Sequence, residues 1–80
     1  MNSTYWYYVI EIHVAPGGYI TESCVIHSFG DKFPLIDALN SAKYLGKKQY
    51  SEIESVRIVE HIEIDKEAFD EFKQRMGNNV

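Results

Sequence analysis

Apolar and polar residues alternate along the first part of the chain. Between residues 5 and 14, one set of alternate positions is apolar throughout, whereas the other changes from aromatic to polar. The first set is Trp6, Tyr8, Ile10, Ile12 and Val14, and the second is Tyr5, Tyr7, Val9, Glu11 and His13. A period of two is typical of a β-strand with two different faces. We therefore expect a core against the first face, and the contacts of the second face are the main question.

A β-hairpin is predicted over residues 5–29. The turn is Ala15-Pro16-Gly17-Gly18, and the strand pattern resumes from Tyr19 to Phe29. We favour a three-residue loop, residues 16–18, because it puts a more apolar set on the core side than a two-residue loop does. In that register Ile20, Cys24 and Ile26 lie opposite Val14, Ile10 and Tyr8, Glu22 lies opposite Ile12, and His27 lies opposite Tyr7.

Two helices and one further strand are predicted after the hairpin. Residues 34–45 have helical spacing, with Pro34 in the first turn and Gly46 as the stop. Residues 54–64 form a strand whose core side is Val56, Ile58, Ile62 and Ile64, interrupted by Glu60; its other side carries Arg57, Val59, His61 and Glu63. Asp65 then caps a last helix with the apolar stripe Ala68, Phe69, Phe72 and Met76, ending at Gly77.

The order β-β-α-β-α predicts an α+β fold with a three-stranded antiparallel sheet of order 2-1-3. A right-handed helical crossover makes the third strand parallel to the second, and pairing beside the first strand then makes it antiparallel to that strand. The first helix is expected to pack on one face. The chain is expected to form one domain over residues 1–80, with residues 1–4 and 77–80 frayed.

Charge and composition narrow the range of partners. The chain has 80 residues, a net charge of −4 and a single cysteine. The negative charge disfavours general binding to nucleic acid. With one cysteine no internal disulfide can form, which favours a reducing, cytoplasmic environment. No apolar run is long enough to cross a membrane, and the first residues do not have the pattern of a signal peptide.

The residues that could perform chemistry are not spaced for a known reaction. His13, His27 and His61 are expected on the second face, with His27, Tyr7 and His61 in one row, but the outer histidines would be too far apart to share an ion. Cys24 is expected in the core, where a thiol is inert. We therefore predict no metal, no cofactor and no catalytic residue.

These observations favour a non-catalytic protein-interaction module that forms a homodimer. The class includes small acidic accessory or inhibitory proteins, some of them virus-encoded. The expected binding residues on the second face are Tyr5, Tyr7, Val9, His27, Phe29, Val59 and His61. The alternative is a small dimeric enzyme or ligand-binding protein with a pocket lined by Tyr7, His27, His61 and Glu11. The second face could instead be covered by the last helix of the same chain.

Overall fold

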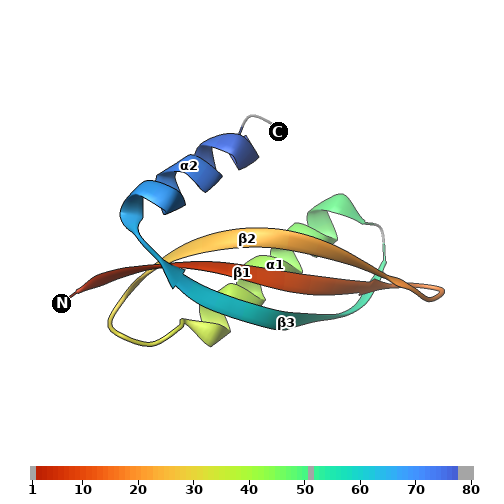
Figure 1. Cartoon of the computed structure of the whole chain (residues 1–80). Coiled ribbons are helices and arrows are strands. Elements are labelled where there is room, and N and C mark those ends of the chain that lie inside the picture. Colours follow the sequence, from red (N-terminus) through yellow and green to blue (C-terminus); the bar gives the residue numbers. More distant parts are fainter. Residues whose placement is uncertain (1, 51, 78–80) are drawn as a thin grey trace.

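The computed structural model describes residues 2–50 and 52–77 and has the predicted element order. The strands are β1 (Ser3–Val14), β2 (Tyr19–Phe29) and β3 (Ile53–Ile64), and the helices are α1 (Leu35–Gln49) and α2 (Lys66–Gly77). The strands form one antiparallel sheet in the order β2-β1-β3. The two helices lie on opposite sides of this sheet (Figure 1). The predicted α+β class and strand order are therefore confirmed.

The start of β1 lies within the segment that was expected to fray. Ser3 and Thr4 belong to the strand, and Thr4 is buried. Its hydroxyl accepts a hydrogen bond from the Trp6 indole N–H at 3.0 Å. This bond satisfies the polar atom of a largely buried tryptophan, so the strand is held in place from its first residues. The expected fraying of residue 1 and of residues 78–80 lies outside the described residues, and Gly77 is the last residue of α2.

The hairpin register differs by two residues from the predicted one. Tyr8 lies opposite Cys24, Ile12 opposite Ile20, and Glu22 opposite Ile10. The ladder is closed by a hydrogen bond from the Val14 N–H to the Gly18 carbonyl at 3.2 Å, so the loop begins at residue 15. Gly18 has φ 104°, which glycine adopts without the steric penalty of a side chain. Because the shift is an even number, every side chain keeps its predicted face.

The core lies between α1 and the first face of β1. Tyr8, Ile10 and Ile12 have almost no exposed surface, and they meet Ala38 and Ala42 of the helix. Gly46 continues this line of small residues one turn later. A Cβ added at Gly46 would lie 3.3 Å from the Ile53 side chain and 3.5 Å from that of Ile12. Small residues at this spacing allow the helix to approach the sheet closely.

This close packing explains why Gly46 does not end α1 as predicted. The helix continues to Gln49, and the Tyr50 N–H donates to the Gly46 carbonyl at 2.9 Å. Pro34 is the N-cap residue instead of a first-turn residue. At the start of α2, Asp65 is the predicted cap, because its carboxylate accepts a hydrogen bond from the Ala68 N–H at 2.7 Å.

The third strand carries an extra residue that changes which side chains face α1. Ile58 pairs with Ile10, but Glu60 pairs with Val9, so Val59 is a β-bulge. Before the bulge, Val56 and Ile58 face the core as predicted. After it, Ile62 and Ile64 pair with Tyr7 and Tyr5 and lie on the second face, whereas His61 and Glu63 lie on the first. The predicted alternation was wrong for this half of β3 because it assumed an unbroken ladder.

Candidate functional site

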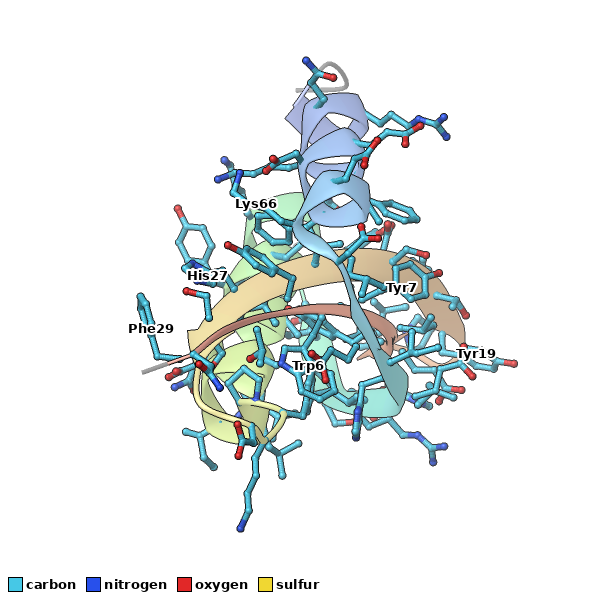
Figure 2. All side chains as sticks on the ribbon, turned by 60° about the vertical axis from the view of Figure 1, so that its left-hand side comes forward. Trp6, Tyr7, Tyr19, His27, Phe29 and Lys66 are labelled. Atoms are coloured by element: carbon cyan, nitrogen blue, oxygen red, sulfur yellow. The ribbon has the colours of Figure 1, made fainter. Side chains whose placement is uncertain are left out.

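Helix α2 covers only one end of the second face. Phe69 is its one buried side chain among the described residues, and its ring centroid lies 5.0 Å from that of Tyr5. Tyr5 also stacks on His27, with centroids 4.7 Å apart and an interplanar angle of 11°. In Figure 2, His27 lies on the α2 side of the sheet and Trp6 on the opposite side. Two of the predicted binding residues, Tyr5 and His27, therefore form a small aromatic cluster under the first turn of α2.

Next to this cluster the second face has an apolar area that α2 covers only in part. Tyr7 lies between Val25 on β2 and Ile62 on β3, so these three side chains form a row across the sheet. Ile62 is 60% exposed, and Phe72, whose ring lies 5.1 Å from that of Tyr7, is 37% exposed. Val9 follows Tyr7 on the same face. We call these residues the open patch: Tyr7, Val9, Val25, Ile62 and Phe72.

The open patch continues onto the surface of α2. A hollow of about 110 Å³ lies beside Phe72 and is also lined by Ala68, Glu71 and Arg75. Glu71 and Arg75 form an ion pair at 2.9 Å at its edge. An apolar floor with a charged rim is the usual composition of a protein-binding surface.

Beyond Val9 the second face becomes polar. The Glu11 carboxylate lies 3.1 Å from His13 and 3.3 Å from Arg57, and Arg57 is largely exposed. Exposed ion pairs of this kind contribute little to stability. This cluster marks where the apolar area ends, as the sequence pattern of the second face indicated.

His61 does not belong to the second face, contrary to the prediction. It lies opposite Tyr8, not opposite Tyr7, and its ring stacks on Phe33 with centroids 4.1 Å apart and an interplanar angle of 1°. The Trp6 ring also contacts the His61 ring edge-on, with centroids 5.7 Å apart. The bulge at Val59 is the physical reason, because it reverses the facing of the residues that follow. The row of His27, Tyr7 and His61 is not formed, since His27 lies opposite Tyr5.

The pocket of the alternative hypothesis is therefore not assembled within one chain. His61 lies on the α1 side, whereas Tyr7 and Glu11 lie on the α2 side and His27 lies in the aromatic cluster. Among the described residues, no three His, Cys, Asp or Glu side chains are grouped so that they could hold a metal ion. The arrangement on this face suits apolar contact better than acid-base chemistry.

Cys24 lies in the core, as predicted. It is buried opposite Tyr8 in the hairpin. Burial raises the pKa of the Cys24 thiol, and burial likewise raises the pKa of the Tyr8 hydroxyl. Both groups are neutral at pH 7, so neither is an activated nucleophile.

The remaining predicted residues lie at the margins of the site. Phe29 is 65% exposed at the end of β2, and its ring lies 4.8 Å from that of His27. Val59 is the bulge residue and is 44% exposed. Sequence reasoning missed Val25, Ile62 and Phe72 as parts of the surface. The signal for Ile62 was Glu60, because a charged residue within a core-facing run indicates a possible break in the alternation.

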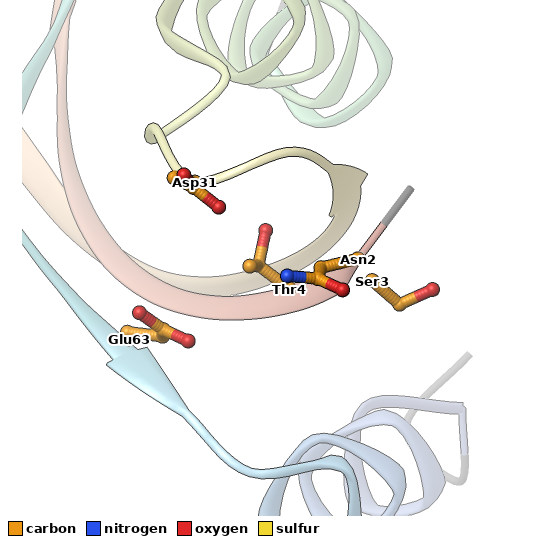
Figure 3. A pocket seen from close by; sticks show the side chains of 5 residues that line it. All are labelled: Asn2, Ser3, Thr4, Asp31 and Glu63. Atoms are coloured by element: carbon orange, nitrogen blue, oxygen red, sulfur yellow. The ribbon is translucent and has the colours of Figure 1, made fainter.

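A separate polar hollow lies at the end of the sheet where β1 begins. It is lined by Asn2, Ser3, Thr4, Asp31 and Glu63 (Figure 3). The two carboxylates come from the loop after β2 and from β3, on either side of β1. This hollow is open and its lining is polar, whereas the open patch is apolar.

Comparisons of the chain with protein-family models, curated proteins and solved structures gave no match. Among the helices formed by the described residues, none has the length and apolar character needed to cross a membrane.

Proposed function

We propose that the chain is a non-catalytic protein-interaction module and that the open patch binds a protein partner. The observation that supports this most directly is the row Val25, Tyr7 and Ile62, in which Ile62 is 60% exposed and Val25 and Tyr7 are only half-buried beside Phe72 of α2. Exposed, contiguous apolar surface on a small domain is characteristic of interaction sites. The proposal includes an accessory or inhibitory role in the cytoplasm.

The charge near the patch favours a partner with a basic surface. The net charge of the chain is −4. Glu60 lies opposite Val9 at the edge of the patch and has no ion-pair partner among the described residues. Arg57 and Arg75 each pair with a glutamate, and Lys73 lies over the ring of Phe69 on the side of the aromatic cluster. A partner with an apolar anchor surrounded by Lys or Arg would match this arrangement.

Substitution of one exposed residue tests the proposal. Ile62→Glu places a charge at the β3 end of the row without removing a buried side chain, so the chain should fold normally. Capture from cells that naturally make the protein should yield a specific partner with wild type and lose it with Ile62→Glu. Binding of that purified partner should weaken by at least about tenfold, as expected when a charge replaces an exposed apolar contact of the interface.

Ile36→Glu is the matched control. Ile36 is 68% exposed on α1, on the opposite side of the molecule, so this variant has the same chemistry and charge change outside the patch. Binding should equal that of wild type. Equal binding by wild type and Ile62→Glu would show that the open patch is not the interaction site.

A further inference from the structure

The two edges of the sheet differ in how they are protected from pairing with another chain. Strand β3 has extra residues at Val59 and Glu54, which interrupt its ladder, and it carries four charged residues. Strand β2 has an uninterrupted ladder over its 11 residues, and Glu22 is its one acidic or basic residue apart from His27. It contains no Pro and no Lys. Bulges, prolines and charges are the usual means of preventing edge-to-edge pairing, and β2 has one of them, the charge of Glu22 on the core side opposite Ile10.

The alternation of hydrogen bonds between β1 and β2 shows which backbone groups of β2 point away from β1 and toward solvent. The Val14 N–H donates to the Gly18 carbonyl, and the Gly30 N–H donates to the Asn2 carbonyl. Directly opposed residues alternate between bonded and non-bonded pairs in an antiparallel ladder. The even-numbered residues of β2 therefore bond to β1. The odd-numbered residues direct their N–H and carbonyl groups away from the sheet, and they are Tyr19, Thr21, Ser23, Val25, His27 and Phe29.

Two exposed aromatic residues stand at the ends of this edge. Tyr19 is 60% exposed and Phe29 is 65% exposed. Both are odd-numbered, so both lie on the second face with outward-directed backbone groups. They are placed symmetrically about Cys24. Antiparallel pairing of two β2 strands centred on Cys24 would put each Tyr19 directly opposite Phe29 of the other copy.

We propose that β2 pairs with β2 of a second copy about a two-fold axis at Cys24, which extends the sheet across both chains. This pairing goes beyond the proposed function, because it uses the edge of β2 and not the open patch, and it assigns an interface to the homodimer that the sequence favours. In this register Glu22 faces Ile26, and Thr21 faces His27, so no like charges meet across the axis. The cross-strand pairs of Tyr19 and Phe29 supply aromatic contacts at both ends of the interface.

Removal of one outward N–H tests this pairing. Thr21→Pro deletes a donor that the chain itself does not use, and proline is tolerated on a free edge. Wild type should have twice the 9.3 kDa chain mass by light scattering, and the variant should weaken dimerisation by at least about tenfold. Thr21→Val is the control, because it removes the hydroxyl but keeps the N–H; it should dimerise like wild type.

Two further measurements keep the test decisive. If Thr21→Pro does not fold, Thr21→Lys places a charge at the exposed edge and should also give monomers, whereas Ser55→Lys on β3 should not. In the dimer, the amides of Thr21, Ser23, Val25 and His27 should exchange slowly with solvent and become fast on dilution. A monomeric wild type, or fast exchange of these amides in a dimer, would overturn the proposal.

The two proposals fail separately. The Ile62→Glu variant should remain a dimer, because Ile62 lies on β3, which is the opposite edge strand of the sheet from β2. If wild type dimerises through β2 but Ile62→Glu has no effect on partner binding, the open-patch function is wrong and the edge pairing stands. If the chain is monomeric but loses its partner on Ile62→Glu, the opposite holds.

Discussion

The two faces of the sheet are covered by helices that pack in different ways. On the first face, Ala38, Ala42 and Gly46 bring α1 against fully buried residues of β1. On the second face, the large rings of Phe69 and Phe72 meet those of Tyr5 and Tyr7, and most of α2 remains exposed. Small side chains allow close, extensive packing, whereas large rings make contact at a few points. The first face thus provides the core, and the second keeps exposed apolar surface.

The largest expected effect is a loss of folding stability when a side chain is truncated on the first face, compared with the same truncation on the second. Ile12→Ala removes a fully buried side chain and should lower the free energy of unfolding by about 2–5 kcal/mol. Ile62→Ala, at a position that is 60% exposed, should change it by about 0.5 kcal/mol or less. Chemical denaturation of both variants measures the difference. Similar losses for the two would mean that the second face is also a core.

Alkaline pH should destabilise the folded chain, because Tyr8 and Cys24 are buried on the first face as neutral groups. Burial raises the pKa values of Tyr8 and Cys24, so the unfolded chain loses these protons at lower pH than the folded chain. The stabilisation is present below the ordinary pKa values, 10.0 for tyrosine and 9.0 for cysteine, and declines as pH rises above them. Each group should contribute up to about 1.4 kcal/mol per pH unit.

Denaturation at a series of pH values from 8 upward checks this expectation, with Tyr8→Phe as the comparison. The variant has no titrating hydroxyl, so its stability should fall less steeply than that of wild type above pH 10. Identical slopes would show that Tyr8 is not the titrating group.

The smallest effect concerns the attachment of α2. Asp65→Ala removes the side-chain acceptor for the Ala68 N–H and should cost about 1 kcal/mol. Because α2 packs through few residues, the amides of α2 should exchange faster while those of α1 keep their rates. Asp65→Asn, which preserves the acceptor, is the control and should behave nearly like wild type. Equal acceleration in both helices would show that α2 is part of one cooperative unit with the core.

Sequence alone predicted the elements and their order because alternation and capping are local properties. The core face of β1 and the cap at Asp65 could both be identified from neighbouring residues. The hairpin register could not, since turn residues such as Pro16 and Gly17 are compatible with loops that begin at different positions. The role of Gly46 was also hidden, because a glycine near a helix end serves equally as a stop or as a point of close packing.

The candidate surface was predicted in part. The aromatic residues of β1 were identified, but Ile62 was assigned to the core and His61 to the surface. Both assignments depended on unbroken alternation through Val59, and a bulge is set by the pairing of two distant strands. The extent of α2 coverage depends in turn on how Phe69 meets Tyr5, which is a tertiary contact and not a local pattern.

The bulge at Val59 also defines a position at which the chain could change length. Ile58 and Glu60 pair with the adjacent residues Ile10 and Val9, so excision of Val59 would join two segments that already match consecutive partners. The shorter strand would keep the same pairs and the same faces but lose the local twist that a bulge adds. Strand β3 is thus tolerant of a one-residue deletion at this point, whereas a deletion within an uninterrupted part of its ladder would move every later side chain to the other face.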